Sequence, residues 1–400
     1  MSASEMFPVR SAGAGLARPV ELICVALVMA HAVYLAASYW TGAWLIGPDG
    51  GGIPTDFVNV WAAGKLALDG HAAAAYDWPT HKAMEEVALG RPFEGYFGWH
   101  YPPTFLFAAA GLALLPYTAA YVLWTFGTFP AYLAAIRAIV GDRTGYVLAA
   151  AFPAVLCNFV VGQNGFLSAA LLGGALVLLV RRPVLAGVCL GLLTYKPHLG
   201  IVIPIALIAG GHWRACLAAG AVAGVMAVTS WAAFGTDSWH AFIGNISHTS
   251  QAFLSDGWAD FGKLQTSFGL ARTMGLSEAT AWSIQGAVVV VAVAAVTWLW
   301  RSNVAYELKA AALAAAALLA TPYLYTYDLV VLAVPLAFLF RFGQRHGFLE
   351  HEMTGIGIAC GLVLIFPFVT APVGLAAIII VAGLIARRAI TSKAQALSLA

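Results

Sequence analysis

The sequence predicts an all-α, polytopic membrane protein. Of its 400 residues, 61% are hydrophobic and only 10% are charged, whereas globular domains carry about 25% charged residues. The mean hydropathy is +0.84, and the apolar residues form runs long enough to cross a hydrocarbon core about 30 Å thick as helices. A membrane β-barrel would show short segments of alternating hydrophobicity instead. We therefore expect one membrane domain over residues 1–400.

Composition and motifs exclude several classes of function. The net charge is +2 and no basic block is present, so no nucleic-acid partner is expected. The chain has no P-loop, HExxH, GxSxG or GxGxxG within a βαβ pattern. We expect no metal and no cofactor, nucleotides included. The cysteines lie apart in apolar runs, without CxxC spacing, and are interpreted as small core residues: Cys24, Cys157, Cys189, Cys216 and Cys360.

The distribution of Arg and Lys predicts the topology, because these residues mark cytoplasmic loops. One path places all basic clusters on that side, with both termini inside and roughly twelve crossings. The clusters are Arg10 with Arg18, 137–143, 181–182, Arg214, 301–309, 341–345 and 387–393. The predicted crossings are 19–41, 118–139, 145–161, 164–180, 183–195, 198–212, 214–234, 281–300, 304–320, 326–341, 354–369 and 371–387. The first crossing lacks a small-residue cleavage site and is expected to be a retained anchor.

Residues 101–116 are apolar but short and bounded by prolines. A full crossing here would move every later basic cluster outside, so we expect a re-entrant or shallow segment, which is tolerated where protein buries the backbone. The alternative is an extra crossing with inverted later loops.

With this path, the polar stretches collect on the extracytoplasmic side: the long first loop 42–100, residues 162–165, 194–198, the second loop 235–280, and 321–328. The first loop is expected to hold two short helices. Residues 56–68 carry an apolar stripe typical of a helix on the bilayer surface. Residues 80–89 have Thr80 as a candidate N-cap and Gly90 as a stop.

Asp56 follows Pro54 and Thr55 at the start of that first helical pattern. An ionisable residue so close to lipid is expensive to keep and suggests a functional site. It could be a general base that takes a proton from a hydroxyl. It could also be a helix N-cap, since Asp accepts backbone N–H bonds there; the two roles are compatible.

Lys196 precedes Pro197, which favours a break or a new helix start. A lysine beside the amide end of a helix makes a site for phosphate or carboxylate. Alternatively, Lys196 extends to the lipid headgroups. His198 shares this turn, either as a ligand contact or as a packed polar residue.

The remaining candidates are amides and aromatic residues on the same face. Gly162 and Gly165 explain a tight turn, whose amides Gln163 and Asn164 could hold sugar hydroxyls. Five further candidates are Tyr325, Tyr327 and Asp328 at the mouth of a late crossing, and His100 with Tyr101 at the end of the first loop. The tyrosines could instead belong to an interfacial aromatic belt. Together these groups suggest transfer from a lipid-linked phosphate donor.

Short motifs follow the chain in order from about residue 50 to residue 340: Asp56-Phe57 to Gly64, Tyr76-Asp77, Tyr101-Pro102-Pro103, Gly162-Gln163-Asn164, Ala186-Gly187 with Lys196-Pro197, and Thr321-Pro322-Tyr323 with Tyr327-Asp328. This ordered set resembles glycosyltransferase family 87. The resemblance implies the GT-C membrane fold and a polyprenyl-phosphate-sugar donor, with mannose as the sugar of the best-known members. It also implies that an aspartate of the first extracytoplasmic loop, here Asp56, is the catalytic base.

The leading hypothesis is therefore an inner-membrane hexosyltransferase that glycosylates a lipid or glycan acceptor on the extracytoplasmic face. Its partners would be the lipid-linked donor, the acceptor and the bilayer. The alternative is a transporter or flippase of lipid-linked sugars, but transporters usually show related halves, and none are visible here. A non-enzymatic scaffold leaves Asp56 and the Lys196-Pro197 break unexplained.

Overall fold

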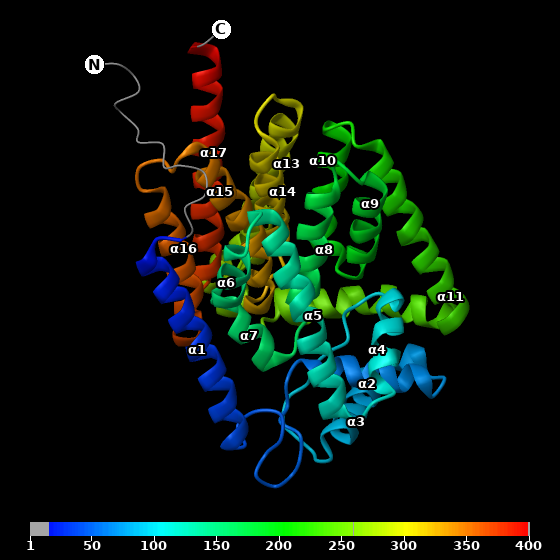
Figure 1. Ribbon diagram of the computed structural model, residues 1–400. Coiled ribbons are helices and arrows are strands. Elements are labelled where there is room, and N and C mark those ends of the chain that lie inside the picture. The colour runs from blue at the N-terminus through cyan, green and yellow to red at the C-terminus, as the bar shows by residue number, and fades with distance from the viewer. Residues whose placement is uncertain (1–15, 259, 399–400) are drawn as a thin grey trace.

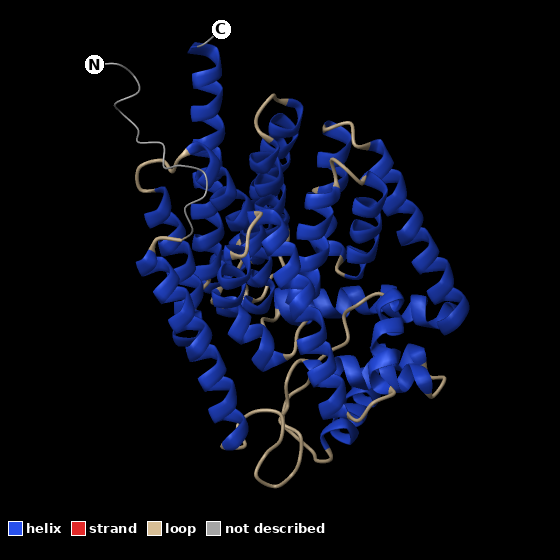
Figure 2. Ribbon diagram, viewed as in Figure 1, coloured by secondary structure: helices blue, strands red, loops and turns tan. Residues whose placement is uncertain are grey.

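The computed structural model describes residues 16–258 and 260–398, and these ranges are helical throughout, with connecting loops (Figure 2). They contain no β-strand, only one isolated antiparallel bridge between Ile46 and Gly52. The all-α expectation is confirmed. The α-helices are α1 Arg18–Trp40, α2 Phe57–Leu68, α3 Trp78–Leu89, α4 Leu106–Ala113, α5 Tyr117–Val140, α6 Thr144–Ala151, α7 Ala154–Val161, α8 Gly165–Leu178, α9 Pro183–Leu192, α10 Ile203–Ala209, α11 Trp213–Ser250, α12 Ser267–Thr273, α13 Glu278–Arg301, α14 Tyr306–Ala320, α15 Ala333–His346, α16 Glu352–Ile365 and α17 Val373–Ser398.

Six helices in the described ranges are long and apolar enough to cross a membrane, or up to seven if the bent pair of α6 and α7 is one crossing. The six are Arg18–Trp40, Tyr117–Val140, Trp213–Ser255, Glu278–Arg301, Thr326–His346 and Val373–Ser392. Each overlaps a crossing predicted from the sequence. Several other predicted crossings coincide with helices of fewer than 18 residues, α8 and α9 among them. The chain is thus a polytopic membrane protein.

Several of the basic clusters lie at one end of the helix bundle (Figure 1). The α10–α11 and α13–α14 connections and the C-terminal end of α17 lie at one end, and these segments include or adjoin the basic clusters near 214, 301–309 and 387–388. Helices α2, α3 and α4 lie at the other end. This division agrees with the basic clusters facing one side. Arg10 lies outside the described residues.

The short apolar segment after residue 101 forms one 3-10 turn, Pro103–Phe105, followed by α4. An α-helix rises about 1.5 Å per residue, so the 8 residues of α4 fall far short of a hydrocarbon core about 30 Å thick. The length favours the shallow segment over the extra crossing.

Helix α2 corrects one expectation. The sequence predicted a helix here, and its bounds agree, but the apolar stripe does not lie on the bilayer surface. Phe57 and Val60 are buried inside the protein. A Cβ at Gly64 would lie 2.0 Å from the Ala109 carbonyl oxygen, so α2 packs directly on the backbone of α4. Periodicity cannot distinguish a lipid-facing stripe from one covered by a neighbouring helix.

Two further boundaries differ from the sequence predictions. Helix α3 begins earlier, because the Asp77 side chain, not Thr80, is the N-cap and accepts the Thr80 N–H at 3.2 Å; Gly90 ends the helix as expected, with φ of +70°. Residues 235–280 are not simply a loop. Helix α11 bends at Gly235 and then continues to Ser250, with its second half running across the bundle (Figure 1).

Candidate active site

The turn between α7 and α8 brings two distant loops together. Gly162 has a φ of +70°, and a Cβ on it would lie 2.7 Å from the Cβ of Phe57, at the start of α2. A Cβ on Gly165 would lie 2.4 Å from the carbonyl oxygen of Tyr327. Both glycines are therefore required by close approach, and Gly162 also by its left-handed backbone conformation. The turn is packed between the Asp56 loop and the segment that precedes α15.

A hydrogen-bond chain connects Asp56 to both amides of this turn. Gln163 donates from Nε2 to Oδ2 of Asp56 at 3.2 Å and accepts at Oε1 from the Tyr101 hydroxyl at 3.0 Å. Asn164 donates from Nδ2 to the same Tyr101 hydroxyl at 2.8 Å. Four predicted site residues from three separate segments thus lie in one network. The Tyr76 hydroxyl fixes this arrangement by donating to the Tyr101 carbonyl at 2.9 Å.

Asp56 occupies the N-cap position of α2, but its side chain makes no capping hydrogen bond. Capping therefore does not account for this carboxylate. The residue is half-buried, and loss of hydration raises the pKa of the Asp56 carboxyl to about 6, an effect partly offset by the Gln163 hydrogen bond. A carboxylate with a pKa close to neutrality suits a general base.

Charged groups around Asp56 act in both directions on its pKa. The negative charge of Asp328 raises it, whereas the positive charges of Lys263 and Lys196 lower it. Lys263 is the last residue of the short 3-10 turn Phe261–Lys263 and is exposed. No sequence pattern indicated it, because a single lysine in a long polar loop carries no motif.

Lys196 and Asp328 form a buried ion pair. The ammonium nitrogen of Lys196 contacts Oδ1 of Asp328, and the two residues are 3% and 1% exposed. The other carboxylate oxygen, Oδ2, accepts the backbone N–H of Tyr325 at 3.3 Å. Both were predicted as site residues, but their pairing was not. At this depth Lys196 cannot extend to lipid headgroups, so that alternative is wrong.

Aromatic side chains line the same region. The rings of Tyr325 and Tyr327 stack with centroids 5.7 Å apart, and the Tyr327 ring centroid lies 5.4 Å from the Lys196 ammonium. Tyr323 contacts the rings of both His100 and His198, at 6.5 and 6.2 Å. The tyrosines thus pack on other predicted site residues, and a lipid-facing aromatic belt does not describe them.

The second half of helix α11 also contacts the site, through hydrogen bonds to His100 and Trp99 that the sequence did not predict. Thr249 makes a 3.0 Å hydrogen bond with Nδ1 of His100, and Asn245 donates to the Trp99 carbonyl at 3.2 Å. Burial lowers the pKa of His100 to about 4, so its imidazole is neutral at physiological pH. These α11 residues could not be found from spacing alone, because the bend at Gly235 decides where they lie.

A second carboxyl group lies deep in the first loop. Glu85 and His81 of α3 are fully buried, with 3.6 Å between Nε2 of His81 and Oε1 of Glu85. Loss of hydration raises the pKa of Glu85 to about 8 and lowers that of His81 to about 3. Both groups are neutral near pH 7. Glu85 also accepts the Phe97 N–H at 3.4 Å and so helps to position the segment leading to His100.

No group of three or more His, Cys, Asp and Glu side chains suited to a metal ion occurs within residues 16–258 and 260–398.

Comparison with known proteins assigns the chain to a family. A model of glycosyltransferase family 87 matches residues 99–322, more than half of the 400 residues. The match includes Gln163, Asn164 and Lys196, while Asp56 and Asp328 lie outside it. No curated protein and no solved structure shows significant similarity. The chain belongs to glycosyltransferase family 87 and is a membrane glycosyltransferase.

Proposed function

We propose that this enzyme transfers a hexose, in the first instance mannose, from a polyprenyl-phosphate-linked donor to a hydroxyl of a lipid or glycan acceptor, with Asp56 as general base. The main support for the proposal is the orientation and the pKa of the Asp56 carboxylate. Its carboxylate makes no helix cap, is oriented by Gln163, and has a pKa close to 6. An oriented base with a pKa near the working pH is what general base catalysis requires.

The reaction that follows is a displacement at the anomeric carbon. Asp56 takes the proton of the acceptor hydroxyl, and the acceptor oxygen forms the new bond to the anomeric carbon. The bond from that carbon to the donor phosphate breaks, and polyprenyl phosphate leaves with the electron pair. Negative charge grows on the phosphate oxygen in this step, so nearby fixed cations lower the barrier.

Two lysines are candidates for that stabilisation. The ammonium group of Lys196 has three N–H donors. Its one hydrogen bond within the described residues goes to Asp328, which leaves donors for a phosphate oxygen. Lys263 is exposed, and its ammonium group makes no hydrogen bond or ion pair with another described residue. Because Asp328 already balances the charge of Lys196, we propose that Lys263 adds the net positive charge that the donor needs.

Unpartnered buried atoms around the network support sugar binding. Within the described residues, Oδ1 of Asn164 and Nε2 of His198 are buried without a hydrogen-bond partner. Buried polar groups in proteins almost always have partners, and a bound sugar offers several hydroxyls. The stacked rings of Tyr325 and Tyr327 offer an apolar face for the same sugar.

We further propose the GT-C architecture with roughly twelve crossings in one domain, 1–400, of the inner membrane. The loop 42–100 and residues 235–280 would lie on the extracytoplasmic side with the site. The opposite position of the basic connections and of α2 to α4 supports this orientation (Figure 1).

The direct test is incubation of the purified enzyme with a panel of polyprenyl-phosphate sugars and candidate acceptors, with products identified by mass spectrometry. We expect product only from lipid-phosphate donors; transfer from a nucleotide sugar alone would refute the proposed donor class. Donor affinity should fall in Lys196→Ala and in Lys263→Ala and be partly kept in Lys196→Arg, which retains the charge. Lys65→Ala is the matched control, because Lys65 pairs with Asp69 on the surface.

A further inference from the structure

The end of the molecule opposite Asp56 contains a cavity of about 420 Å³ that the glycosyl transfer does not use. It lies between the C-terminal ends of α5, α8 and α15 and the start of α14. Three arginines line it, Arg181, Arg182 and Arg341, together with one carboxylate, Glu307. That carboxylate is already paired with Arg345 at 2.8 Å. The cavity therefore carries an excess of positive charge.

The arginines are only partly explained by the fold. Arg341 donates from Nη1 to the carbonyl of Ile139 at 2.6 Å and so satisfies the C-terminal end of α5. Its Nε, however, is buried and has no acceptor within the described residues. Arg181 and Arg182 are exposed, and no described residue pairs with their guanidinium groups. An unused buried donor and two free cations at one cavity indicate an anionic ligand.

The rest of the lining is apolar and includes Val177, Leu178, Val180 and Phe338. Val180 is 62% exposed, so part of this apolar wall faces out of the protein. A charged cavity with an apolar, outward-facing wall suits an amphipathic molecule better than a free anion. Basic pockets between transmembrane helices are known to bind lipid head groups in this way.

We propose that this cavity binds the phosphate group of a membrane lipid, with Arg181, Arg182 and Arg341 as its ligands. Arginine suits phosphate because its planar guanidinium can donate two parallel hydrogen bonds. The apolar wall would receive the glycerol or the first methylenes of the chain. In the proposed orientation the cavity faces the cytoplasmic leaflet, but the binding does not depend on that orientation.

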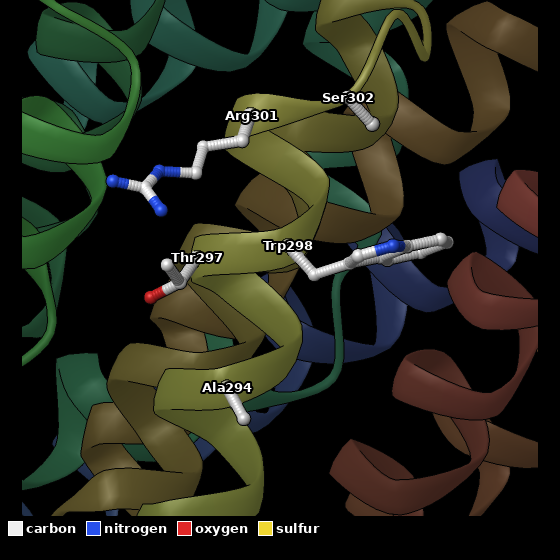
Figure 3. A pocket seen from close by; sticks show the side chains of 5 residues that line it. All are labelled: Ala294, Thr297, Trp298, Arg301 and Ser302. Carbon is white, nitrogen blue, oxygen red and sulfur yellow. The ribbon is translucent and has the colours of Figure 1, made fainter.

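The competing explanation is that these arginines only set the topology. Arg301 provides a matched control, because it lies at the same end of the molecule in a different hollow. That hollow, about 510 Å³, is lined by Ala294, Thr297, Trp298, Arg301 and Ser302. Figure 3 shows the Arg301 side chain extending from α13 on the side of Thr297, away from Trp298. Arg301 is its one charged lining residue, so a three-arginine site is not formed there.

The test measures lipid retention by native mass spectrometry on the purified full chain, with phosphatidylglycerol and zwitterionic phosphatidylcholine as probes. Wild-type protein should retain phosphatidylglycerol selectively. One cation near a membrane surface contributes about a five-fold gain in affinity, so Arg181→Gln with Arg182→Gln should lower retention by about 25-fold. This double variant leaves Arg341 and its bonds to α5 in place, and an unchanged melting temperature would verify folding.

Arg301→Gln should retain the lipid as the wild type does. An equal loss of phosphatidylglycerol retention in Arg301→Gln and in the double variant would overturn the proposal. Retention would then depend on the positive charge at this end of the molecule and not on a specific site. Retention of both lipids alike by the wild type would overturn it too. A separate arm titrates inorganic phosphate by calorimetry: binding as tight as that of phosphatidylglycerol would identify a free-anion site and refute the lipid assignment.

Discussion

The buried pair of Lys196 and Asp328 makes a prediction that separates a functional role from a structural one. Each residue is almost fully buried, so removing one partner leaves an uncompensated charge away from water. Such a loss costs about 3–5 kcal/mol. For a chain of this size, we extrapolate roughly 1–2 °C of melting temperature per kcal/mol. Lys196→Met and Asp328→Asn should therefore each lower the melting temperature by about 5 °C.

The double variant, Lys196→Met with Asp328→Asn, removes both charges and should recover most of that loss, because neutral groups of similar volume replace a buried pair at little cost. Its activity then decides the role of Lys196. If Lys196 binds the donor phosphate, the double variant is stable but has weak donor affinity and low turnover. Melting curves and initial rates on the four proteins complete the cycle. A double variant that regains both stability and wild-type turnover would refute the functional role of Lys196.

Three further predictions follow from the loop 42–100 and its surroundings. Because burial raises the pKa of Glu85 from 4.5 to about 8, its protonated form is favoured in the folded state, and wild-type stability should fall between about pH 5 and pH 8; Glu85→Gln should flatten this dependence in melting curves, and an unchanged slope would contradict the assigned pKa. Tyr101→Phe removes the hydroxyl that Gln163 and its neighbour share, so turnover should fall by about ten-fold, as expected for a lost hydrogen bond of about 1.4 kcal/mol, whereas wild-type rates would show that the network is not needed. In a cysteine-free background, an impermeant thiol reagent added outside should label Asp69→Cys and leave Arg182→Cys unlabelled. Both positions are exposed, so a difference in labelling reports the side of the membrane, and labelling of Arg182→Cys would refute the orientation.

Much of the fold was predictable because a long apolar run in the sequence is enough to identify a membrane helix. Long apolar runs such as α1 and α13 coincide with predicted crossings, and Gly90 ends α3 as expected. The predictions that were wrong concern features set by contacts with other parts of the chain. Phe57 of the α2 stripe packs on Tyr117 and Tyr121 of α5, and Gly64 permits the close approach of α4. Asp77, rather than Thr80, caps α3 because the helix extends one turn further back.

For the candidate site, the sequence predicted individual residues but not the contacts between them. Asp56, Gln163, Asn164 and Tyr101 were predicted as separate residues, and the structure joins them in one hydrogen-bond network. The contribution of Lys263 depends on the position of a segment more than 200 residues from Asp56 in the chain, which no local pattern specifies. The ion pair of Lys196 is equally invisible, because its partner lies 132 positions along the chain.

Asp56 is proposed to remove the proton of the acceptor hydroxyl, and Asp56→Asn tests this role most directly. Asn keeps the size of the side chain and can still accept the Gln163 hydrogen bond, but it cannot take a proton. Turnover should fall by about 10²–10⁴, the contribution of general base catalysis. The melting temperature should not fall, because the ionised carboxylate is itself disfavoured by burial. Wild-type turnover should also decline below about pH 6, as Asp56 becomes protonated. A folded Asp56→Asn enzyme with wild-type turnover would contradict the account.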